Sequence, residues 1–203
     1  MVINMFDILA INRHRFATDG RGITTLIGLA GCPLNCKYCI NNEILKAGVY
    51  RKMTPEELAD DIMIDYCYFY ATGGGITFGG GELLMQSKQI KEIRTLLPDN
   101  IKINVETSLN VTSNRLFDVL DFVDELIIDI KATDNTIYKK YTGANNSRVI
   151  KNLKHIEKEN KQDNCTIRIP MIAEFTSSGD VENAKKFIKN MGFKNIDEFV
   201  YIV

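Results

Sequence analysis

The chain has 203 residues, of which 45% are hydrophobic, and its 25 lysines and arginines nearly balance 26 aspartates and glutamates. This is the composition of a globular chain that can bury its own core without disulfides. Because the net charge is close to zero, the chain has no overall positive potential. This argues against bulk binding of nucleic acid or of an anionic membrane. No apolar run is long enough to span a membrane and no signal peptide is evident, so we expect a cytoplasmic protein.

The chain begins with an extended lead-in over 4–10 and 13–17. Short β-branched or apolar runs then predict six strands, at 23–29, 76–78, 101–105, 125–130, 166–169 and 198–203. Helical patterns lie between them, at 54–70, from about Leu83, from about Ser113, at 146–159 and at 179–190. The first of these helices has Thr54 as its N-cap and Pro55 at its first position.

This alternation predicts an α/β fold with parallel strands. The sheet is either open and doubly wound or a curved partial barrel, and in both cases ligands bind at the carboxyl ends of the strands. Repeats and Pro/Ser-rich linkers are lacking, so a single domain should span residues 1–203.

Three of the five cysteines lie close together in Cys32-Pro-Leu-Asn-Cys36-Lys-Tyr-Cys39, within a loop at 31–41. Such spacing favours metal binding over a disulfide framework. A structural zinc site would need a fourth ligand, whereas three thiolates suit a four-iron cluster with one open iron. A redox pair of Cys36 and Cys39 would leave Cys32 unused. Cys67 and Cys165 are expected to be buried as small hydrophobes.

Glycines and polar residues follow the predicted strands at the same end as the cysteines: Gly79-Gly80-Gly81-Glu82, Glu106-Thr107 and Asp129-Ile130-Lys131, with Arg168 inside the fifth strand. The glycines would let a ligand approach the backbone, and a tight turn is the alternative. The side chains of Asp129 and Lys131 should lie on the same face of the strand. Burying their charges would cost free energy unless a partner of opposite charge is present. Either a zwitterionic or polyhydroxy ligand or an internal ion pair would supply it.

Together these residues resemble the radical S-adenosylmethionine (SAM) superfamily, whose marker is Cys-x3-Cys-x2-Cys with an aromatic residue before the last cysteine, here Tyr38. More narrowly, the chain resembles the glycyl-radical-enzyme activating enzymes of the pyruvate formate-lyase type. The matching segments are 19–23, 73–82, 106–108, 129–131 and 141–146. The resemblance implies a partial (β/α)6 TIM-like barrel as the radical SAM core.

At matching positions, the resemblance implies that Cys32, Cys36 and Cys39 hold a [4Fe-4S] cluster whose open iron binds SAM. Further SAM contacts would come from backbone around Tyr38, Cys39 and Ile40, from Gly80, Gly81 and Glu82, and from Asp129, Ile130, Lys131 and Arg168. A monovalent cation would bind Glu106, Thr107, Asp129 and the carbonyl of Ile127.

The implied activity is that of an anaerobic oxidoreductase, in which reductive cleavage of SAM gives a 5'-deoxyadenosyl radical that takes a glycine hydrogen from a partner glycyl radical enzyme. A flavodoxin or ferredoxin would supply the electron, and the enzyme would act as a monomer. One alternative is a small radical SAM enzyme acting on a small molecule or nucleotide. The other is a non-catalytic iron–sulfur module.

The sequence departs from the family pattern at several positions. Arg21 replaces a proline, Gly79 a serine, and Ile40 a residue that is often histidine. The family's SAM-contacting histidine after the sixth strand has no counterpart before Val203. We therefore expect a barrel with an open side, in a chain that is either naturally short or shortened.

Overall fold

The computed structural model describes residues 4–16 and 19–201. Within these residues, one eight-stranded sheet has the order β3-β1-β2-β4-β5-β6-β7-β8. The six strands from β2 to β8 in this order pair in parallel: β2 (Ile23–Leu29), β4 (Gly75–Gly80), β5 (Lys102–Thr107), β6 (Glu125–Asp129), β7 (Cys165–Ile172) and β8 (Asn195–Tyr201). All six predicted strands are confirmed, although 202–203 of the last lie outside the described residues.

Two further strands extend the sheet beyond β2. The lead-in is extended as predicted and forms β1 (Phe6–Phe16), which pairs antiparallel with β2; its predicted residue 17 is not among those described. The short β3 (Arg51–Met53), which the sequence analysis did not predict, pairs antiparallel with β1. The described sheet is therefore open, with β3 and β8 at its edges, as expected for a partial barrel.

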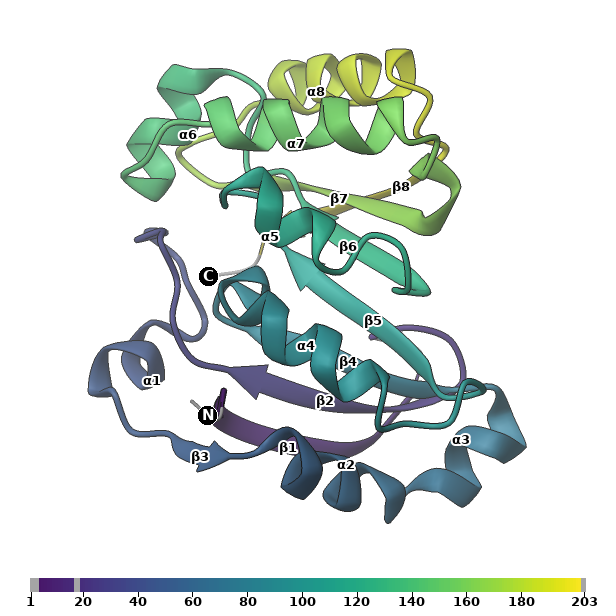
Figure 1. Cartoon of the computed structure of the whole chain (residues 1–203). Helices are drawn as coiled ribbons and strands as arrows, with labels where there is room; N and C mark the ends of the chain where they lie inside the picture. The colour runs from purple at the N-terminus through teal and green to yellow at the C-terminus, as the bar shows by residue number, and fades with distance from the viewer. Residues whose placement is uncertain (1–3, 17–18, 202–203) are drawn as a thin grey trace.

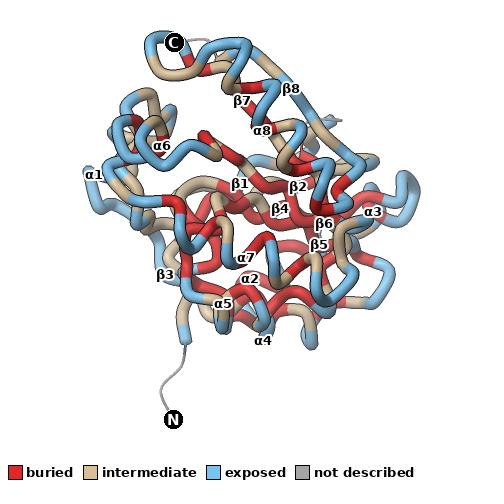
Figure 2. Tube along the Cα trace, turned by 90° about the horizontal axis from the view of Figure 1, so that it is seen from above, coloured by how far each residue is buried: buried red, intermediate tan, exposed pale blue. Residues whose placement is uncertain are grey.

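The helices follow the strands that they connect: α1 (Asn42–Ala47), α2 (Pro55–Met63), α3 (Tyr66–Thr72), the 3-10 helix η1 (Leu83–Gln86), α4 (Ser87–Arg94), α5 (Ser113–Phe117), α6 (Asn135–Thr142), α7 (Ser147–Lys158), η2 (Gln162–Asn164) and α8 (Ser178–Asn190). Helices α4, α5 and α7 cover one face of the sheet (Figures 1 and 2). The strands point toward α1, α6 and the cysteine loop (Figure 1).

The predicted helix at 54–70 is wrong as a single element, because the structure has a break between α2 and α3. Asp65, at the break, is almost fully buried and accepts hydrogen bonds from Arg13 Nη1 (2.5 Å) and Thr25 Oγ1 (2.7 Å). His14 Nε2 lies 3.3 Å from its other oxygen. A buried carboxylate needs such partners, and they fix the turn between the two helices.

The core lies on both sides of the central strands, where Figure 2 shows the buried residues concentrated. Ile76 and Phe78 of β4 and Ile103 and Val105 of β5 are fully buried, which is typical of parallel strands between covering layers. No described helix is long and apolar enough to cross a membrane.

The two isolated cysteines have different environments. Cys165, at the start of β7, is buried in the core as predicted. The prediction for Cys67 is wrong, because this residue of α3 is exposed. The apolar run around it includes the exposed Ile64 and Tyr70, so local hydrophobicity did not indicate burial there.

Candidate active site

One cavity of about 440 Å³ opens at the carboxyl ends of the parallel strands, a volume ordinary for a small-molecule site. Most of the predicted site residues line it, namely Cys32, Cys36, Cys39, Ile40, Gly80, Gly81, Glu106, Thr107, Asp129, Lys131 and Arg168. Four others do not line it, and one of them, Ile127, lines a different cavity. Tyr38 packs on aromatic rings, Glu82 is buried behind the glycines, and the side chain of Ile130 belongs to the core.

The cysteine loop is held in place by hydrogen bonds from distant elements. The backbone nitrogens of Asn35 and Lys37 donate to carbonyls at the end of α6, at 2.9 and 3.1 Å. Asn41 Nδ2 donates to the Gly80 carbonyl (2.8 Å), and Tyr201 Oη on β8 donates to the Tyr38 carbonyl (2.6 Å). The three thiols are therefore positioned by β4, α6 and β8 together.

All three thiols of the loop are free and half-buried. Burial raises the pKa of Cys36 to about 11 and also raises that of Cys32, so both must lose a proton to bind metal. Over 4–16 and 19–201, no three Cys, His, Asp or Glu side chains are arranged around a single metal ion. A four-iron cluster binds each thiolate through a different iron, and three thiolates around one cavity fit that requirement.

Glu82 is a buried support for the glycine turn. Its carboxylate accepts hydrogen bonds from Thr107 Oγ1 (2.6 Å), from Ser108 Oγ (2.6 Å) and from Ser108 N (2.9 Å). Burial raises the pKa of Glu82, and these donors oppose the rise. The residue thus fastens the turn after β4 to the turn after β5, and the backbone of Gly80 and Gly81 faces the cavity.

Six charged side chains line the cavity wall as three ion pairs, one of which joins Arg15 Nε to Asp19 Oδ2 at 2.6 Å. Lys131 Nζ lies 3.2 Å from Asp129 Oδ2, and Arg168 Nη1 donates to Glu106 Oε1 at 2.8 Å. Burial is the largest influence on Lys131 and opposes its charge, but the acidic groups around it, led by Asp129, together outweigh burial and raise the pKa of Lys131. Burial also raises the pKa of Glu106, against the influence of Arg168. Asp129 and Lys131 therefore form the internal ion pair that the sequence left open as an alternative, and both residues also line the cavity.

Aromatic residues that the sequence analysis did not select complete the site. Phe199 and Tyr201 lie on the same side of β8 and line the cavity, as does Tyr141 of α6. Outside it, Tyr38 packs edge-on against Tyr141 and Phe175. The alternation of Phe199 and Tyr201 along β8 was the available signal for two of these residues.

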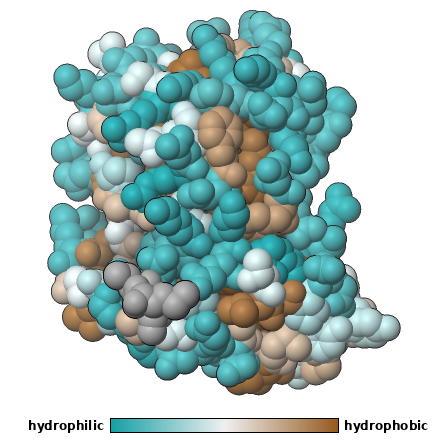
Figure 3. Space-filling view, in the orientation of Figure 1, coloured by the Kyte–Doolittle hydropathy of each residue, from teal (hydrophilic) through white to brown (hydrophobic). Residues whose placement is uncertain are grey.

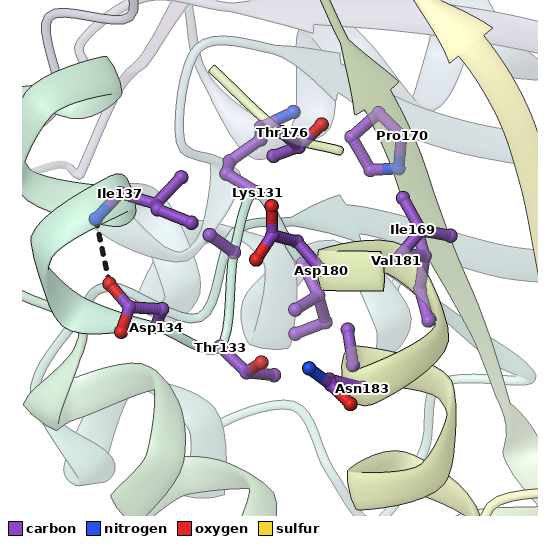
Figure 4. Close-up of a pocket in the computed structure, with 13 residues that line it drawn as sticks. Lys131, Thr133, Asp134, Ile137, Ile169, Pro170, Thr176, Asp180, Val181 and Asn183 are labelled. Atoms are coloured by element: carbon purple, nitrogen blue, oxygen red, sulfur yellow. Dashed lines mark hydrogen bonds between the residues drawn. The ribbon is translucent and has the colours of Figure 1, made fainter. Parts of the chain in front are cut away.

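A second cavity, of about 140 Å³, lies between α6 and α8 (Figure 4). Lys131 lines both cavities. Asp134 faces the smaller one but caps α6 through Ile137 N (2.9 Å), and Asp180 caps α8 through Ser177. The two carboxylates of this space therefore serve helix capping, and of the two cavities only the larger is lined by cysteines.

The sequence model of the Radical SAM superfamily matches residues 26–188, which include the cysteine loop, the glycine turn and the Asp129–Lys131 and Glu106–Arg168 pairs. The chain belongs to the radical SAM superfamily. It is therefore related to enzymes with oxidoreductase chemistry, and the family implies SAM and a [4Fe-4S] cluster.

Among its relatives, the radical SAM protein is similar to activating enzymes of several organisms. It is 27% identical to the (2S)-3-sulfopropanediol dehydratase activating enzyme of Klebsiella oxytoca, over 90% of this chain and 77% of that one. It is 29% identical to the pyruvate formate-lyase-activating enzyme of Clostridium pasteurianum, over 89% and 74%. The expected similarity to this group of enzymes is thereby confirmed.

Solved structures confirm the fold. SuiB of Streptococcus suis, bound to S-adenosylmethionine, matches with a TM-score of 0.65 at 15% identity, over 85% of this chain and 39% of SuiB. The enzyme anSMEcpe with bound AdoMet matches with a TM-score of 0.61 at 14% identity, over 85% of this chain and 49% of that one. At such identities the likeness concerns the partial barrel alone.

Proposed function

We propose that this radical SAM protein activates a glycyl radical enzyme by reductive cleavage of SAM and removal of one glycine hydrogen. The observation that carries the proposal is the meeting of three free thiols, the glycine turn and the Asp129–Lys131 pair on one cavity. When bound, the cluster and SAM would supply an electron and a 5'-deoxyadenosyl radical. We further propose that the enzyme acts as a monomer in the cytoplasm.

Each group on the cavity has a defined part in this proposal. Cys32, Cys36 and Cys39 would hold the cluster, and the backbone of Gly80 and Gly81 would receive the methionyl end of SAM. Lys131 would attract its carboxylate, and Asp129 would accept hydrogen bonds from the ribose. The backbone at 38–40 would meet the adenine.

The test is anaerobic reconstitution with iron and sulfide, followed by dithionite and SAM. We expect 5'-deoxyadenosine and methionine in equal amounts, and a glycyl radical signal by electron paramagnetic resonance when the correct partner is added. Cluster assembly without SAM cleavage would favour the non-catalytic iron–sulfur module. Cleavage that produces no radical on any glycyl radical enzyme, but alters a small molecule or nucleotide, would favour the second enzymatic alternative.

The electron donor would approach from the side of the cysteine loop and α1. Ile40 beside Cys39 is 84% exposed, and Ile44 and Val49 are exposed next to it. Figure 3 shows hydrophobic atoms at the lower left of the molecule, where Figure 1 places α1. Segment 37–52 also has four basic residues and one acidic residue. A flavodoxin or ferredoxin with an acidic surface fits such a face.

Lys46→Glu is expected to slow reduction by such a donor about tenfold at low salt, because the exposed Lys46 contributes to steering rather than to the cavity. Cleavage driven by dithionite should stay unchanged. The measurement is the rate of 5'-deoxyadenosine formation with each reductant. Lys189→Glu, at the carboxyl end of α8 and exposed, is the matched control. Equal slowing by both variants would count against this face.

A further inference from the structure

The residues expected to bind a monovalent cation already have partners. Glu106 Oε1 accepts from Arg168 Nη1 at 2.8 Å. Thr107 Oγ1 donates to Glu82 Oε1 at 2.6 Å and accepts from Leu109 N at 2.9 Å. Asp129, the third expected ligand, lies 3.2 Å from Lys131 Nζ. A cation would therefore compete with two side chains that are themselves positively charged.

The backbone at residue 79 makes room for the Glu106–Arg168 pair. A Cβ atom on Gly79 would lie 2.8 Å from Glu106 Oε2 and 2.7 Å from Leu26 Cδ1, closer than real Cβ contacts allow. The resemblance leads one to expect serine at this position. Glycine here leaves space for the Glu106 carboxylate, which reaches Arg168 from β5 across β6. Glycine at position 79, which departs from the family pattern, and the Glu106–Arg168 ion pair are therefore linked.

Arg168 is suited to act as a fixed positive charge on this wall. It is the register partner of Asp129 on the neighbouring strand, and its Nε lies 3.9 Å from Asp197 Oδ2. Its side chain is 22% exposed and that of Glu106 is 23% exposed, so the pair is partly shielded from water and borders the cavity. A guanidinium keeps its charge at any physiological pH and binds carboxylates directionally.

We propose that Arg168, oriented by Glu106, supplies the positive charge for which the family resemblance implies a monovalent cation. The proposal rests on the proposed function, since the anion that needs this charge is the carboxylate of SAM. The cavity wall has three basic side chains, Arg15, Lys131 and Arg168, against three acidic ones, Asp19, Glu106 and Asp129, so its charges balance before SAM binds and it needs no added ion. SAM binding should therefore be independent of potassium and sodium.

The first measurement is sodium NMR relaxation on the purified protein, titrated with sodium and then potassium. We expect no saturable sodium site in the wild type or in Arg168→Lys, and a potassium-displaceable site in Arg168→Gln. Saturable sodium binding by the wild type would overturn the proposal, as would the lack of a site in a folded Arg168→Gln. This comparison needs neither SAM nor cluster, so it holds even if the proposed function fails.

The second measurement is SAM affinity of the cluster-loaded enzyme in potassium chloride and in choline chloride at equal ionic strength. The wild-type affinity should be the same in both salts. Arg168→Gln should bind SAM about tenfold more weakly in choline chloride, as expected for loss of one charged hydrogen bond, and should recover in potassium chloride. A wild-type affinity that rises with potassium would overturn the proposal. Gly79→Ser, which should displace Glu106 without changing any charge, is expected to weaken SAM binding equally in both salts, because Arg168 keeps its charge but loses its orienting partner.

Discussion

Replacing Cys36 by alanine is expected to abolish both cluster assembly and SAM cleavage. Two thiolates cannot hold three irons of a four-iron cluster, and no other cysteine among the described residues lines the cavity. The fold should survive, because Cys36 lies in a loop held mainly by the backbone bonds of Asn35 and Lys37. Loss of the cluster is measured by iron and sulfide content and by visible absorbance. Loss of SAM cleavage is measured by 5'-deoxyadenosine formation.

Two other cysteines provide controls of different kinds. Cys67→Ala, on the exposed side of α3, should leave cluster content, activity and stability unchanged. Cys165→Ala removes a buried sulfur and should cost about 1 kcal/mol of unfolding free energy without loss of the cluster. Full activity in Cys36→Ala, or loss of the cluster in Cys67→Ala, would refute the assignment of the ligands.

The parallel strands could be predicted because each is an apolar or β-branched run between helical patterns. The break at Asp65 could not be predicted, because its partners Arg13, His14 and Thr25 lie on strands forty or more residues earlier. α6 was missed although its signals are local, with Asp134 as N-cap and Gly143 at its carboxyl end. The break at Asp65 thus depends on long-range contacts, whereas the limits of α6 are set by its own capping residues.

In the candidate site, too, local sequence patterns could be predicted, whereas contacts between distant segments could not. The spacing of Cys32, Cys36 and Cys39 is local, and all three line one cavity. The burial of Glu82 behind the glycines and the pairing of Glu106 with Arg168 depend on which strands lie side by side. Residue types alone therefore indicate the chemistry, whereas partners within the site depend on the sheet order.

Gly81→Ala is expected to reduce SAM cleavage by about a hundredfold, although residue 81 has no side chain that could react. A Cβ atom there would lie 2.1 Å from the carbonyl oxygen of Gly31, just before Cys32. The turns are joined at this point, since Gly81 N donates to Leu29 O (3.0 Å) and Glu82 N to Gly31 O (2.8 Å). The clash should separate the cysteine loop from the glycine turn by about 1 Å, enough for such a loss if these segments hold the cluster and SAM as proposed.

Gly179→Ala is the matched control, because a Cβ atom in this first turn of α8 would meet only Ser177 Oγ at an ordinary 3.6 Å. It should keep full activity and gain up to about 1 kcal/mol of stability from the higher helix propensity of alanine. Thermal unfolding and the rate of 5'-deoxyadenosine formation are measured for both variants. If Gly81→Ala cleaved SAM at the wild-type rate, then the contact between the two turns would not set the geometry of the site. An inactive but normally stable Gly81→Ala would instead place the effect on SAM and the cluster rather than on folding.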